Sequence, residues 1–178
     1  MSIGMSMSPK TGRTVIGLLT FGLLLTGCQR DDEDGPLSVA GRLFEFNYRN
    51  ATAAYILTLN RDRDLAEGSI VETSYENPVG GPPIVTSTKV YPFWRQIALR
   101  SPDIHCVVKE HPYAVTITLK DKAGETLQTL KTEVVSNIDQ TILPAKALIV
   151  GPIYTPNTAV FKGDGTADFS PETGCRQS

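Results

Sequence analysis

Thiol and imidazole groups are scarce in this chain, and they are the side chains best suited to do chemistry. The 178 residues include three cysteines, Cys28, Cys106 and Cys175, and two histidines, His105 and His111. A cysteine beside a histidine could act as a nucleophile or bind a metal ion. Zinc sites use four ligands, and these residues follow no spacing typical of one. We therefore expect no metal site, and we keep a metal ligand or reactive thiol at Cys106 as the alternative interpretation.

Cys28 stands at the end of an apolar run with the layout of an export signal. Lys10 and Arg13 are the only charged residues before the run, which extends from Val15 to Leu25, and a polar, acidic string follows at 29–34. This order of basic, apolar and small residues is typical of a secretory signal. The run has eleven residues, whereas a helix needs about 20 to cross a bilayer. We expect a cleaved signal over residues 1–27.

The sequence Leu25-Thr26-Gly27-Cys28 resembles the lipobox of bacterial lipoproteins. The resemblance covers residues 1–28. It implies cleavage before Cys28, a thioether-linked diacylglycerol on the sulfur, and several acyl chains such as palmitate, which together hold a protein firmly on a membrane. In that family an aspartate after the cysteine favours the inner membrane. This chain has Gln29 instead, so we expect a lipid anchor in the outer membrane of the cell envelope, on its periplasmic or surface face.

With Cys28 assigned to lipid, Cys106 and Cys175 remain as an even pair outside the cytosol. Such a pair most often forms a disulfide. The two residues are 69 positions apart, and closing a loop of that length stabilises a fold by roughly 4 kcal/mol in the chain-entropy model. We predict a bridge that ties down the C-terminal tail.

The charge balance argues against a nucleic-acid partner. Without residues 1–27 the chain has 15 basic and 19 acidic residues and a formal charge of minus 4. Nucleic-acid-binding domains usually carry a basic patch or stripe. The 151 residues that remain are enough for one domain.

Alternating apolar and polar residues predict short strands, and no stretch has helical spacing over three turns. The predicted strands lie at 42–48, 55–59, 71–75, 84–90, 96–100, 104–108, 113–120 and 125–135, and the segments 141–143 and 147–150 could supply further strands. In the strand at 104–108 we expect Ile104, Cys106 and Val108 to face inward. Prolines and glycines make 76–83 a loop. Seven to nine strands favour an all-β fold, a single antiparallel immunoglobulin-like sandwich.

Residues 112–124 resemble the F–G hairpin of immunoglobulin-like and fibronectin-type-III-like domains. Asp121 and Gly124 suit the turn, and Tyr113 has the position of a tyrosine corner. Leu127 and Leu130 are out of phase with strict alternation, so we expect a bulge in the return strand. Val115 takes the place of the second inter-sheet cysteine of antibody domains, so the predicted bridge is a different device.

One aromatic segment is a candidate ligand contact. Tyr91, Phe93, Trp94 and Arg95 lie together around Pro92, and such rings could stack on a sugar or a peptide. The alternative is that Trp94 belongs to the core of the sandwich.

Catalytic motifs are missing from the sequence. Glu72, Glu76 and Asp103 could pair as in a glycosidase, and the segment 163–168 superficially resembles a calcium loop. Solvated carboxylates are the simpler interpretation of both. We expect no enzyme activity and no cofactor.

Together these features predict a signal at 1–27, an acidic tether at 28–38, a sandwich domain at 39–160 and an irregular tail at 161–178. The expected function is that of a lipid-anchored, non-catalytic module that binds or scaffolds an envelope protein or polysaccharide. The alternatives are a small envelope hydrolase and a structural subunit of a secretion or export assembly.

Overall fold

The computed structural model describes Met1 and residues 35–175, which form nine strands and one short 3-10 helix. The elements are β1 (Leu37–Asn47), β2 (Thr52–Arg61), β3 (Ile70–Tyr75), β4 (Ile84–Lys89), β5 (Gln96–Arg100), β6 (Pro112–Lys120), β7 (Thr126–Val135), η1 (Gln140–Ile142), β8 (Ile149–Val150) and β9 (Thr155–Pro156). Cys28 and the whole predicted signal lie outside the described residues.

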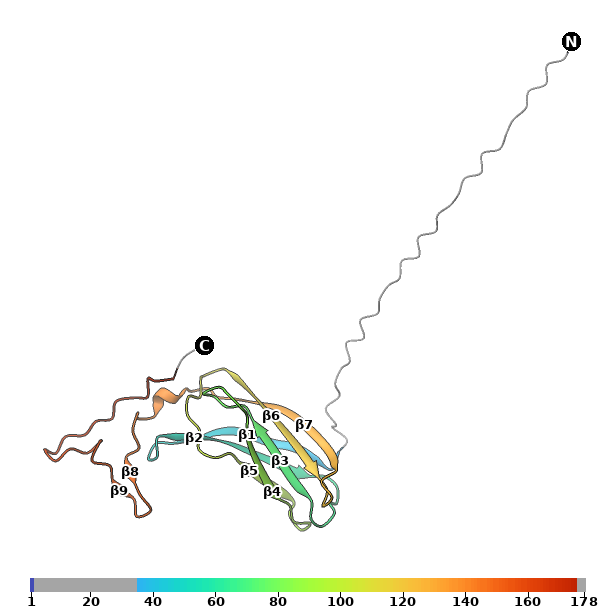
Figure 1. Cartoon of the computed structure of the whole chain (residues 1–178), viewed down its shortest axis with the longest axis horizontal. Coiled ribbons are helices and arrows are strands. Elements are labelled where there is room, and N and C mark those ends of the chain that lie inside the picture. The colour runs from blue at the N-terminus through green and yellow to red at the C-terminus, as the bar shows by residue number, and fades with distance from the viewer. Residues whose placement is uncertain (2–34, 176–178) are drawn as a thin grey trace.

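Two antiparallel sheets form the body of the protein (Figure 1). One sheet has the strand order β1-β2-β5 and the other has the order β4-β3-β6-β7, while β8 and β9 make a separate small hairpin. The prediction of an all-β antiparallel sandwich is confirmed. Because β4 pairs with β3, the fourth strand belongs to the four-stranded sheet, unlike that of an antibody constant domain.

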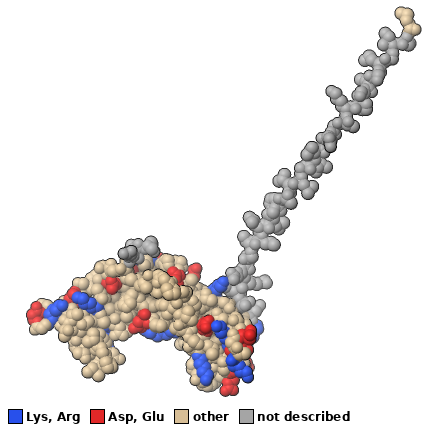
Figure 2. All heavy atoms as spheres, in the orientation of Figure 1, with Lys and Arg blue, Asp and Glu red and all other residues tan. Residues whose placement is uncertain are grey.

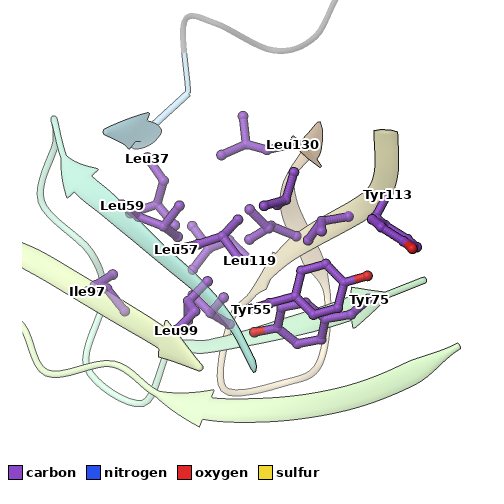
Figure 3. Close-up of a cluster of buried hydrophobic side chains, with 14 of the residues drawn as sticks. Leu37, Tyr55, Leu57, Leu59, Tyr75, Ile97, Leu99, Tyr113, Leu119 and Leu130 are labelled. Atoms are coloured by element: carbon purple, nitrogen blue, oxygen red, sulfur yellow. The ribbon is translucent and has the colours of Figure 1, made fainter. Parts of the chain in front are cut away.

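Alternate residues of the central strands fill the space between the sheets (Figure 3). Period-two geometry sends every second side chain to one face, and the apolar residues follow this period. The inward set on four strands is Tyr55, Leu57, Leu59, Val71, Tyr75, Ile97, Leu99, Val115, Ile117 and Leu119, all of which are at most 1% exposed. The three tyrosines Tyr55, Tyr75 and Tyr113 form one aromatic group at one end of this core.

The β6–β7 hairpin has the expected turn and bulge. The Asp121 side chain accepts hydrogen bonds from the amides of Ala123 and Glu125, and Gly124 has a φ of 87°, which suits glycine. Pairing steps from Leu119↔Gln128 to Lys120↔Thr126, so Leu127 is the extra residue of a bulge. The bulge prediction is confirmed.

A glutamine side chain joins the two sheets where β1 begins. The amide nitrogen of Leu37 donates to Gln128 Oε1 at 3.0 Å, and Gln128 Nε2 donates to the Leu37 carbonyl at 2.8 Å. The side-chain amide of Gln128 in β7 thus pairs with the backbone of β1 as a neighbouring strand would. Leu37 is only 1% exposed, so packed structure begins within the range 28–38 predicted as a tether.

Two predicted strands are wrong. At 104–108 the only pairing is an isolated bridge between Ile104 and Ala53. Cys106 has a φ of 66°, which reverses the local chain direction and sends Val107, rather than Val108, into the core. At 141–143 the chain forms the end of η1 instead, capped by the Asp139 side chain.

The chain after β7 forms a C-terminal extension, residues 136–175. Leu143 and Val160 are its buried anchors, and the amide of Leu148 donates to the Arg49 carbonyl at 2.8 Å. In Figure 1 the β8–β9 hairpin lies at the opposite end of the molecule from the start of β1.

Candidate functional site

Cys106 and Cys175 form a disulfide with a Cα–Cα distance of 5.0 Å. The bridge connects the loop before β6 to the end of the C-terminal extension, across 69 positions of sequence. The predicted pairing is confirmed.

Tyr113 holds the loop that carries Cys106. Its hydroxyl accepts a hydrogen bond from the amide of Val108 at 2.8 Å and lies 3.4 Å from the Cys106 carbonyl, to which it donates. This is the bond pattern of a tyrosine corner, as expected from the sequence. Burial raises the pKa of Tyr113, against the opposing effect of the Val108 amide. The phenol therefore stays protonated and able to donate.

The connection between β4 and β5 contains an aromatic turn, which we define as residues 91–94. The amide of Trp94 donates to the Tyr91 carbonyl at 3.0 Å and closes the turn. The Tyr91 ring centroid lies 5.6 Å from that of Phe93 and 5.0 Å from that of Trp94. Trp94 packs against the core, whereas Phe93 is 76% exposed. Trp94 therefore fits the interpretation as a core residue, and the ligand contact stays a prediction for the exposed rings.

Arg61 at the end of β2 holds the aromatic turn in place. Its guanidinium donates to the Pro92 carbonyl, and its backbone amide donates to the Arg95 carbonyl at 2.9 Å. The next residue, Asp62, donates its amide to the Pro36 carbonyl, also at 2.9 Å. The aromatic turn therefore lies beside the residue from which the chain enters β1.

An open hollow of about 800 Å³ lies against the aromatic turn. Tyr91 and Phe93 line it, but Trp94 and Arg95 do not. Sequence reasoning missed its other polar lining residues, Glu67, Lys89 and Lys122, since they come from two connections and the end of β4, which are far apart in the sequence. The Lys89 amino group lies 5.7 Å from the centroid of the Tyr91 ring, within the range of a cation–π contact.

The carboxylates considered for catalysis each bond a different group. Glu72 pairs with Lys120 at 2.9 Å, and Asp103 pairs with Arg100 at 3.1 Å. Glu76 accepts a hydrogen bond from the Ala114 amide at 2.9 Å and lies 3.4 Å from His111. These three residues are distributed over separate ion pairs and turns rather than gathered in one cleft.

Within residues 35–175 no group of three or more His, Cys, Asp or Glu side chains could hold a metal ion. In the segment that resembles a calcium loop, the Asp164 carboxylate accepts from the amide and hydroxyl of Thr166. The hydroxyl of Ser170 and the ammonium of Lys146 lower the pKa of Asp168. Both carboxylates thus close local turns. In the same described part, no helix has the length and apolar character to cross a membrane.

No family model and no curated protein matches the chain. Among solved structures, the chain is similar to Pseudomonas fluorescens alkylpurine DNA glycosylase AlkC bound to DNA containing an abasic site analog. The identity is 15%, the TM-score is 0.30, and the match covers 57% of this chain and 31% of the glycosylase chain.

This comparison corrects the function expected from the sequence. The structure that the chain is similar to is a DNA glycosylase, so the comparison does not bear out the expected non-catalytic envelope binding or scaffolding module, and neither that module nor its two alternatives is proposed. A likeness this distant assigns no activity to the present chain. The account below therefore rests on the cysteines and on the placement of the chain entry.

Proposed function

We propose that this protein is an exported lipoprotein whose β-sandwich is held at the surface of a bacterial membrane by lipid on Cys28. The observation that carries the proposal is the pairing of Cys106 with Cys175. Since these two thiols bond each other, Cys28 is the one cysteine of the sequence left for another role. It stands directly after the apolar run and the lipobox-like residues Leu25-Thr26-Gly27.

The disulfide also supports an oxidising compartment. Disulfides persist in secreted and periplasmic proteins and are rare in the cytosol. Gln29, in place of an aspartate, supports the outer membrane as the destination. The proposed location is therefore the cell envelope, with the membrane as the first partner of the protein.

The short distance in sequence between Cys28 and β1 keeps the domain near the lipid. Leu37 lies nine positions after Cys28, and nine fully extended steps of the chain span at most about 32 Å. The start of β1 can therefore lie no farther than about 32 Å from the lipid-bearing residue. We propose that the domain acts at the membrane surface. That the chain is not an enzyme and has no nucleic-acid partner stays a prediction.

Metabolic labelling with palmitate tests the attachment. We expect the wild-type protein to take up label and to sediment with membranes, and Cys28→Ser to do neither, because the acylated sulfur is removed. The matched control is the double variant Cys106→Ser with Cys175→Ser, which removes the other two thiols and should keep both label and membrane. An unlabelled wild-type protein, or a Cys28→Ser variant that remains equally membrane-bound, would contradict the proposal.

A further inference from the structure

We infer that the aromatic turn, residues 91–94, contacts the lipid headgroups of the membrane that carries the protein. The inference builds on the proposed lipid attachment and adds an orientation to it: one end of the sandwich faces the membrane. We call this end, where β1 and β5 begin and β2 and β4 end, the entry pole.

The placement of the chain entry is the first argument. Pro36 bonds Asp62, and the adjacent Arg61 bonds Pro92 and Arg95. Arg61 and Asp62, which are neighbours at the end of β2, thus join the aromatic turn to the start of β1. A tether of nine residues that enters here draws this end, and not the far end, toward Cys28. Figure 1 shows the first residues of β1 at the same end as the connection from β4 to β5.

The chemistry of the turn is the second argument. Phe93 is 76% exposed and Tyr91 is 41% exposed, and because their ring centroids are 5.6 Å apart they form one contiguous exposed aromatic patch. Aromatic residues that have one apolar and one polar side prefer the interface between lipid and water. Lys89 beside Tyr91 adds an amino group that can reach phosphate while its carbon stem lies along the ring.

The charge of the entry pole fits a mixed headgroup layer. Acidic and basic side chains alternate there (Figure 2). The connections at this end carry three basic residues, Arg63, Arg95 and Lys122, and five acidic ones, Asp62, Asp64, Glu67, Asp121 and Glu125, and the adjoining strand ends add Arg61, Lys89 and Lys120. Since these six basic and five acidic residues have a formal net charge of only plus one, the rings rather than long-range attraction provide the contact. We therefore expect the contact to depend little on salt, because screening acts on net charge.

Trp94 is the single tryptophan of the chain, and it reports on the turn directly. Its ring centroid lies 6.4 Å from that of Phe93. The experiment places the lipidated mature protein, which begins at Cys28, in vesicles of phosphatidylethanolamine and phosphatidylglycerol that contain brominated phospholipid, a short-range quencher. We expect strong quenching of Trp94, at low and at high salt, and loss of most of this quenching in Phe93→Ser. Phe93 is outside the core, so circular dichroism should show an unchanged fold.

Val79→Ser is the matched control. Val79 is 63% exposed in the connection between β3 and β4, at the end of the sandwich away from the entry pole. This variant should be quenched as strongly as the wild type. If lipidated protein remains on the vesicles but Trp94 is not quenched, or if Phe93→Ser changes nothing, the inference is overturned while the lipid attachment stands. If the protein does not remain on the vesicles, both fail.

The same fluorescence measurement distinguishes contact with lipid from binding of a sugar at the hollow. A Trp94 signal that ignores brominated lipid but shifts when a soluble oligosaccharide is added would identify a sugar site at the hollow, and it would overturn the contact with lipid.

Discussion

Tyr113 links the best-defined hairpin of the molecule to its disulfide. The ring packs in the core against Phe44 and Tyr55, and the hydroxyl bonds both Val108 and Cys106 in the loop before β6. One side chain therefore fixes a loop that has a left-handed residue, Cys106, at its centre.

Tyr113→Phe should lower the free energy of unfolding by about 1 to 3 kcal/mol, because the amide of Val108 loses its acceptor in a partly buried site. Urea denaturation gives the value. Tyr154→Phe is the control, since Tyr154 is exposed in the connection before β9, and its change should be within about 0.5 kcal/mol. Equal stability of the two variants would show that the corner contributes nothing.

Three buried phenols predict a loss of stability at alkaline pH. Burial raises the pKa of Tyr55, Tyr75 and Tyr113 above the usual value of 10.0. A raised folded-state pKa means that the folded protein keeps protons that the unfolded chain releases. The stabilisation is therefore complete below pH 10 and declines as the pH rises above it. Urea midpoints should fall over that range, and the fall should be less steep in Tyr75→Phe. A flat profile would contradict this account.

Sequence periodicity was sufficient to predict the strands and turns that are defined by neighbouring residues in the sequence. Alternation located β2, β3 and β6, and the turn residues located the β6–β7 hairpin with its bulge at Leu127. Periodicity failed at 104–108 because a positive φ at Cys106 interrupts the period that the prediction assumed.

Only part of the candidate site could be predicted from the sequence. The aromatic turn is contiguous in sequence, whereas Lys89, Lys122 and Glu67 meet at its hollow through folding, and the Leu37–Gln128 bonds join residues 91 positions apart.

The C-terminal extension is the element that depends most on a covalent bond. Among the described residues past β9, the β-type pairing consists of two isolated bridges, Phe161↔Ala167 and Pro144↔Pro171. Cys175 ties the end of the extension to the sandwich. The double variant Cys106→Ser with Cys175→Ser should lower the free energy of unfolding by about 2 to 4 kcal/mol. It should also make the extension an early site of proteolysis. Unchanged urea midpoints and an unchanged cleavage pattern would argue against this role.

At the scale of the whole molecule, the two ends of the sandwich have different surroundings. The entry pole carries the start of β1, the aromatic turn and interspersed charges. The C-terminal extension with the β8–β9 hairpin lies at the other end (Figure 1). A lipid on Cys28 would place the first end on the membrane and direct the second away from it. In this proposal the orientation and the location of the protein both depend on the sulfur atom of Cys28.

The intact mass of protein extracted from membranes tests that claim most directly. The account predicts a chain that begins at Cys28, without residues 1–27, and that carries the added mass of a diacylglycerol on its first residue. Digestion should locate the whole addition on the N-terminal peptide, and Cys106 should be recovered joined to Cys175. A mass equal to that of the complete 178 residues, or a mature chain with an unmodified Cys28, would contradict the account.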